Sequence, residues 1–108
     1  MGKTLNIPFP QGTGDRDYLA SFETIFLSQA RDFKPELILI SAGFDAHRED
    51  PLAGLALTEE AYREMTKKLK EIARVSAKER IVSVLEGGYN LEALASSVEA
   101  HLRALTEP

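Results

Sequence analysis

The chain has 108 residues, 44% of them apolar and 28% charged, which is the composition of one small globular domain with a modest core. Its net charge of −4 argues against nucleic-acid binding through a basic surface, and the absence of cysteine excludes disulfides, thiol catalysis and thiolate metal sites. No apolar run approaches the roughly 20 residues of a membrane span and no signal-peptide core opens the chain, so we expect a cytoplasmic protein with no membrane and no direct nucleic-acid partner.

The first segment, TLNIPFP at positions 4–10, is apolar but contains Pro8 and Pro10. Proline lacks the backbone donor that a central strand requires. We therefore expect either an edge strand or an extended leading arm.

A helix is predicted next, because apolar residues recur at helical spacing from Tyr18 to Phe33. Asp15 is a candidate cap for this segment, and Pro35 ends it. The aromatic residues of this helix are interpreted as core.

Two apolar runs, ELILIS at 36–41 and RIVSVLEGG at 80–88, are typical of strands covered on both faces in a parallel sheet. A helix beginning at Thr58 separates them, and another follows the candidate N-cap Asn90. The predicted apolar stripes are Tyr62, Met65, Leu69, Ile72 and Ala73 in the first of these helices and Leu91, Leu94, Val98, Leu102 and Leu105 in the second. The resulting order is strand, helix, strand, helix, strand, helix. This alternation predicts an α/β fold.

Two polar loops follow the two apolar strands, GFDAHREDPLAG at 43–54 and EGGYN at 86–90. Ligands of open α/β sheets bind beyond the carboxyl ends of the strands. If the strands are parallel, Asp45 and Tyr89 emerge at the same edge of the sheet. A carboxylate and a phenol can then share one cleft.

The first loop also allows other interpretations. Asp45 can be an ordinary loop or capping residue, or it can join His47 and Asp50 in a D-x-H-x-x-D pattern that suits a metal. Three ligands from one short loop are uncommon, and His47 alone is expected to be a loop hydrogen-bonder. Arg48 and Glu49 are expected to form a solvated charge pair.

Gly87 and Gly88 suit a strand-to-helix turn that needs positive φ or close backbone approach. A glycine turn before a helix can also bind an anion. The segment has neither the G-x-G-x-x-G spacing nor a P-loop lysine. His101 lies near the end of the last helix, where a cation suits the helix dipole.

Three segments in this order, NIPFPQGTGDRDYLASFETI, PELILISAGFDAHREDPLAGLALTEEAY and VLEGGYN, resemble the zinc-dependent deacetylase superfamily. That superfamily includes class II histone deacetylases, acetylpolyamine amidohydrolases and acetoin-utilisation proteins. The resemblance covers nearly the whole chain. It implies that residues 1–108 are the C-terminal portion of an α/β, three-layer parallel-sheet fold of the arginase/deacetylase type.

The resemblance also implies roles for residues of the two loops. Asp45 would be one of three protein ligands to zinc, and Tyr89 would donate a hydrogen bond to the scissile carbonyl oxygen. Leu52 would line the channel for an acyl-lysine or acyl-amine chain. Gly87 and Gly88 would let the backbone pass close to that channel.

The family's other two zinc ligands, spaced D-x-H, and its general-base histidine pair belong upstream of these motifs, and no histidine precedes residue 41 here. Two hypotheses stay open. The chain is either part of a zinc-dependent amidohydrolase for acetylated lysine or polyamine-type substrates, inactive without an N-terminal half, or a non-catalytic remnant or interaction domain. A sheet cut in this way would expose an edge and apolar faces, which favours pairing with such a half or self-association.

Overall fold

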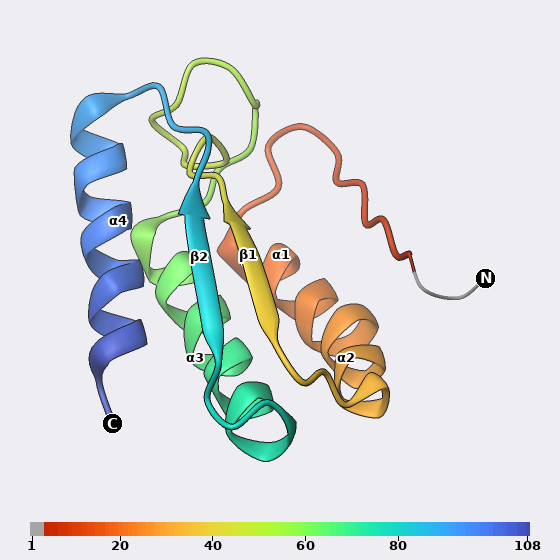
Figure 1. Ribbon diagram of the computed structural model, residues 1–108. Helices are drawn as coiled ribbons and strands as arrows, with labels where there is room; N and C mark the ends of the chain where they lie inside the picture. The colour runs from red at the N-terminus through yellow and green to blue at the C-terminus, as the bar shows by residue number, and fades with distance from the viewer. Residues whose placement is uncertain (1–3) are drawn as a thin grey trace.

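The computed structural model describes residues 4–108. Its elements in chain order are α1 (Asp15–Ser21), the π-helix η1 (Phe22–Leu27), α2 (Ser28–Phe33), β1 (Ile38–Ala42), α3 (Glu59–Ser76), β2 (Ile81–Leu85) and α4 (Leu91–Thr106). β1 and β2 pair in parallel, with Ile38 opposite Ile81 and Ala42 opposite Leu85 (Figure 1). The predicted α/β class with a parallel sheet is confirmed.

The N-terminal segment is an arm and not a strand, since the described residues before β1 contain no strand. The Phe9 ring of this arm stacks on Tyr18, and Gly12 N–H donates to the Gly54 carbonyl over 2.7 Å. A second bond, from Ala56 N–H to the Thr13 carbonyl, measures 2.8 Å. The expected strand at 4–10 is therefore wrong, and the alternative of a leading arm is confirmed.

The first helical segment begins at Asp15, the residue predicted to cap it, and Gly14 occupies the N-cap position. The prediction that Asp15 caps this helix is wrong, because its carboxylate binds Thr58 instead. The segment ends where Lys34 adopts a positive φ of 53° next to Pro35, as expected. Phe33, expected in the core, is 62% exposed.

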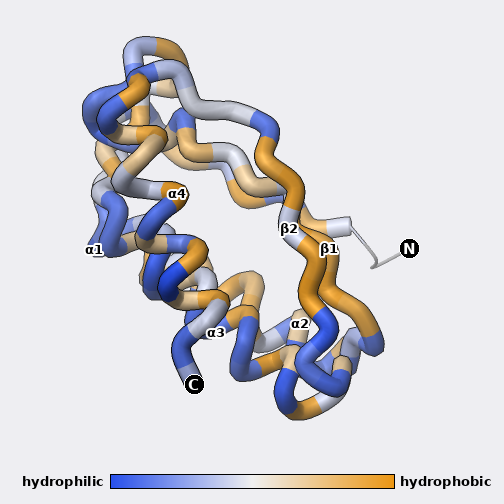
Figure 2. Tube along the Cα trace, turned by 60° about the vertical axis from the view of Figure 1, so that its left-hand side comes forward, coloured by the Kyte–Doolittle hydropathy of each residue, from blue (hydrophilic) through white to orange (hydrophobic). Residues whose placement is uncertain are grey.

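Helices cover only one face of the two strands (Figure 2). The covered face includes Ala42, which is buried, and Ile40, which packs against the core. On the opposite face Leu39 is 71% exposed, and Val82 and Val84 are exposed as well. The expectation of strands covered on both faces is therefore wrong for this chain, whereas the uncovered apolar face expected of a cut sheet is present.

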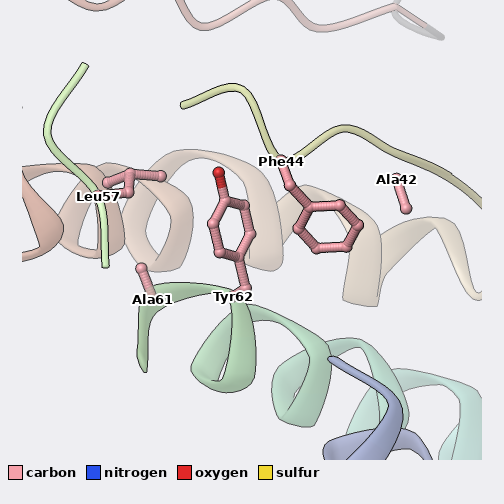
Figure 3. Packing of buried hydrophobic residues seen from close by; sticks show 5 residues of the cluster. All are labelled: Ala42, Phe44, Leu57, Ala61 and Tyr62. Atoms are coloured by element: carbon pink, nitrogen blue, oxygen red, sulfur yellow. The ribbon is translucent and has the colours of Figure 1, made fainter. Parts of the chain in front are cut away.

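The buried core lies directly beneath the loop that follows β1. This part of the core is a cluster of Ala42, Phe44, Leu57, Ala61 and Tyr62 (Figure 3). The Phe44 and Tyr62 rings meet edge to face, with centroids 4.9 Å apart. Both ends of the 43–57 loop are thus held by the core, which limits how far the loop can move.

α4 packs against α3 through small residues. Its buried residues are Ala93, Ser97, His101 and Ala104, whereas Leu91 and Leu102 of the predicted stripe are exposed. Three of these four buried residues have small side chains, so the buried face of α4 differs from the predicted leucine stripe. None of the helices in residues 4–108 has the length and hydrophobicity of a membrane span.

Candidate functional site

Asp45 lies just beyond the carboxyl end of β1, beside the end of β2. The pairing between the two chain segments continues beyond the carboxyl ends of β1 and β2, because Phe44 N–H donates to the Gly87 carbonyl over 2.9 Å. A Cβ atom at Gly87 would lie 3.5–3.6 Å from the Asp45 carboxylate, and one at Gly43 would lie 3.4 Å from Asp45 Oδ1. No described residue gives this carboxylate a hydrogen bond or an ion pair. Asp45 therefore presents free acceptor oxygens next to the loop that carries Tyr89.

Tyr89 and Leu52 are held by the same side chain. Tyr89 N–H donates to Asp50 Oδ2 over 2.8 Å, and Leu52 N–H donates to Asp50 Oδ1 over 2.9 Å. The side chains of Tyr89 and Leu52 are both exposed. The structure therefore brings together the loops of all five predicted site residues, through Gly87 beside Asp45 and through Asp50.

Gly88 is required at its position, unlike Gly87. Its φ is +142°, and a Cβ atom there would lie 2.6 Å from Leu94 Cδ1. Gly87 would place its Cβ only in ordinary van der Waals contact with Asp45. Gly88 thus provides the turn from β2 to the Asn90 cap, where Ala93 N–H donates to Asn90 Oδ1 over 2.9 Å as predicted.

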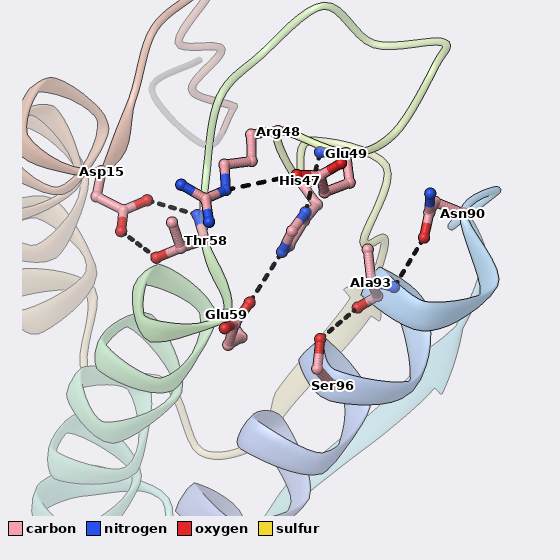
Figure 4. A network of polar contacts seen from close by, with 9 residues as sticks. All are labelled: Asp15, His47, Arg48, Glu49, Thr58, Glu59, Asn90, Ala93 and Ser96. Carbon is pink, nitrogen blue, oxygen red and sulfur yellow. Dashed lines mark hydrogen bonds and ion pairs between the residues drawn. The ribbon is translucent and has the colours of Figure 1, made fainter.

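The D-x-H-x-x-D cluster does not form. His47 is buried, its Nε2 lies 2.9 Å from Glu59 Oε2, and its Nδ1 accepts from Glu49 N–H (Figure 4). Because Nδ1 accepts, Nε2 carries the proton, and this hydrogen bond lowers the pKa of Glu59. Residues 4–108 contain no group of three or more potential ligands that could hold a metal ion. His47 is thus a loop hydrogen-bonder, and Arg48 and Glu49 form the expected exposed pair.

The far end of the loop is tied to α1. Thr58 N–H donates to Asp15 Oδ1 over 2.8 Å, and the Thr58 hydroxyl donates to Asp15 Oδ2 (Figure 4). Thr58 is also the N-cap residue of α3. Asp15 therefore joins the starts of two helices, a contact over 43 positions that no local pattern predicts.

Two phenols lie near Asp45, in a cleft of about 390 Å³ between the end of β1, α1 and α3. Burial, and then the negative charge of Asp45, raise the pKa of Tyr18. Burial also raises the pKa of Tyr62, with smaller contributions from Tyr18 and Asp45. The backbone of Ala46 opposes this rise slightly, although no hydrogen bond of regular geometry reaches the Tyr62 hydroxyl. Both phenols therefore stay protonated beside the carboxylate.

His101 is not the surface cation that its position on α4 predicted. The ring is 6% exposed, with Nδ1 2.8 Å from Thr66 Oγ1 and Nε2 2.8 Å from Ser83 Oγ. The Thr66 hydroxyl donates to the Tyr62 carbonyl, so it accepts from Nδ1, and Nε2 accepts from Ser83. Burial lowers the pKa of His101. The neutral ring thus connects α4 to α3 and β2.

The sequence profile of the histone deacetylase domain matches residues 1–105. The chain belongs to the histone deacetylase family. It is 49% identical over 104 residues to histone deacetylase 14, chloroplastic, of Arabidopsis thaliana, a match covering 96% of this chain and 25% of that protein. It is 47% identical over 98 residues to polyamine deacetylase HDAC10 of Mus musculus, covering 90% of this chain and 14% of that protein.

The solved structure of the HDA15 HD domain superposes on this chain with a TM-score of 0.88 at 37% identity. This match covers 96% of the chain and 29% of that structure. The predicted deacetylase-like α/β fold is confirmed, and this histone deacetylase chain spans about a quarter of the Arabidopsis relative's length.

Proposed function

We propose that this chain supplies part of a zinc-dependent deacetylase site, which hydrolyses the amide bond of an acetylated lysine or amine. One observation carries the proposal: the Asp45 carboxylate has no hydrogen bond from residues 4–108 and lies against Gly87, two positions before Tyr89. Family membership supports the same reaction class.

Asp45 suits a metal because a carboxylate oxygen is an ordinary zinc ligand and this one has no competing partner. A catalytic zinc usually has three protein ligands, so the remaining two would come from the rest of a deacetylase domain. When bound, zinc makes water a nucleophile at neutral pH and polarises a carbonyl. The contribution of this chain is to hold Asp45 between the Gly43 and Gly87 backbones, so that its oxygens face the site.

Tyr89 would donate its phenolic hydrogen to the carbonyl oxygen of the scissile amide. A hydrogen bond to this oxygen strengthens as negative charge develops, and one such donor is worth roughly 10²–10³ in rate. Leu52 would supply apolar surface along the channel for the substrate's alkyl chain. Its side chain is exposed, and its backbone N–H is held by the same Asp50 that binds the Tyr89 backbone.

The relatives support this substrate class, because they are named as histone deacetylases and a polyamine deacetylase. An acetylated lysine and an acetylated polyamine share an acetamide on an alkyl chain. We propose further that the chain alone is inactive, and that the rest of a deacetylase domain covers Leu39, Val82 and Val84.

The test uses the chain joined to the upstream segment that completes a deacetylase domain. Zinc content is measured together with hydrolysis of an acetyl-lysine peptide and of an acetylated polyamine. Tyr89→Phe is expected to lose about 10²–10³ in kcat and to keep zinc. Asp45→Ala is expected to lose zinc, whereas Asp17→Ala, at an exposed carboxylate, keeps both zinc and activity.

Full turnover in Tyr89→Phe would remove Tyr89 from its role. Stoichiometric zinc in the isolated chain would contradict the single-ligand site. A completed protein that folds and hydrolyses neither substrate would favour a non-catalytic interaction domain.

A further inference from the structure

We propose that Asp50 is a positioning residue that sets the places of Tyr89 and Leu52 together, an inference that rests on the proposed function. Its carboxylate bonds the Leu52 backbone in the loop after β1 and the Tyr89 backbone in the loop after β2. Asp50 is neither the proposed zinc ligand nor the proposed hydrogen-bond donor, yet this charged residue is only 8% exposed.

Both carboxylate oxygens of Asp50 are used. Oδ1 accepts from Leu52 N–H at 2.9 Å, within an Asx turn, and Oδ2 accepts from Tyr89 N–H at 2.8 Å across 39 positions. Hydrogen bonds to an ionised acceptor are about twice as strong as bonds between neutral groups. A single side chain therefore fixes two backbone positions that the sequence separates widely.

Asp50 is itself held from the helical layer. Its N–H donates to the His47 carbonyl over 2.9 Å, and the His47 ring bonds Glu59 on α3. A chain of hydrogen bonds thus connects α3 to Tyr89 through His47 and Asp50. This arrangement also accounts for the buried histidine, which holds the loop in place and is not needed as a ligand.

Tyr89 needs such support because little else holds it. Tyr89 is 56% exposed, and it follows Gly88, which has no Cβ to restrict the backbone and adopts a φ of +142°. A donor to a developing oxyanion must lie within about 2.7–3.1 Å of it. A displacement of a catalytic group by about 1 Å can lower the reaction rate by roughly 10²-fold.

The test is Asp50→Asn in the completed protein described above. The amide keeps one acceptor oxygen, so one of the two backbone bonds is lost. We expect kcat to fall roughly 10- to 100-fold with unchanged zinc content and a much smaller change in KM. Glu49→Gln is the matched control, since it removes the same charge at the preceding position, from an exposed side chain that pairs with Arg48. It is expected to stay within about twofold of the parent.

A double-mutant cycle separates positioning from general damage to the fold. If Asp50 acts through the Tyr89 phenol, Asp50→Asn changes kcat by less than about twofold in the Tyr89→Phe background. Equal losses in both backgrounds would overturn the inference. Asp50→Glu keeps the charge, is expected to retain an intermediate kcat, and replaces Asp50→Asn in the cycle if the amide variant does not fold.

Hydrogen exchange gives a readout independent of activity. In Asp50→Asn, amides of 50–54 and 86–90 are expected to exchange faster, while those of the middle of α3 are unchanged. Unchanged exchange in both loops would refute the positioning role. If the completed protein hydrolyses no acetylated substrate, the proposed function fails, and exchange still decides whether Asp50 holds the two loops.

Discussion

Substituting Gly88 by alanine tests the geometry of the loop that carries Tyr89. At a φ of +142° an L-residue is strained, and the new Cβ would lie 2.6 Å from Leu94 Cδ1. Leu94 is partly buried against the core, and Cδ1 is the end of its flexible side chain, which can shift to relieve this contact. Backbone strain is therefore the main effect and is expected to lower the free energy of unfolding by about 1–3 kcal/mol.

Gly87→Ala is the matched control, because it makes the same change one position earlier. The new Cβ would contact the Asp45 carboxylate at 3.5–3.6 Å, an ordinary distance, and φ there lies outside the left-handed region. A Gly→Ala change at a compatible position is worth less than about 1 kcal/mol of stability. Urea denaturation of the completed protein compares the two variants. Equal stabilities would refute the assignment of strain to Gly88.

Two further predictions concern the helices that support the site. Burial lowers the pKa of His101 in the folded state, so the unfolded state binds more protons. The free energy of unfolding therefore falls as the pH decreases below about 6.5, by at most about 1.4 kcal/mol per pH unit. His101→Gln is expected to flatten this slope in urea denaturation between pH 5 and 8, and an unchanged slope would mean that another group titrates. Asp15→Ala removes both bonds to Thr58 and is expected to cost about 2–3 kcal/mol. Asp17→Ala, on the same first turn but exposed, is expected to cost under about 0.5 kcal/mol in the same assay, and equal losses would point to the helix dipole instead.

The location of the site was predictable because it depends on local sequence patterns and on the rule that ligands bind beyond the carboxyl ends of parallel strands. Two apolar runs separated by a helical pattern indicate parallel strands, and parallel strands place the following loops at one edge. The structure confirms this for Asp45 and Gly87.

The wrong predictions about burial share a physical cause, because the burial of a residue depends on what packs against its helix or strand. Leu39 belongs to a run typical of a doubly covered strand, but no described residue covers it. His101 has the position of a surface cation, but α3 and β2 surround its ring.

The sequence alone was sufficient for the order of the later elements, the α/β class and the edge where Asp45 and Tyr89 emerge, because hydrophobic periodicity and turn residues act over a few positions. Only the tertiary structure decided that Asp50 bonds the Tyr89 backbone, that Asp15 holds Thr58 and that His101 is buried. Each of these hydrogen bonds joins residues far apart in the chain, so it exists only once packing has brought their elements together.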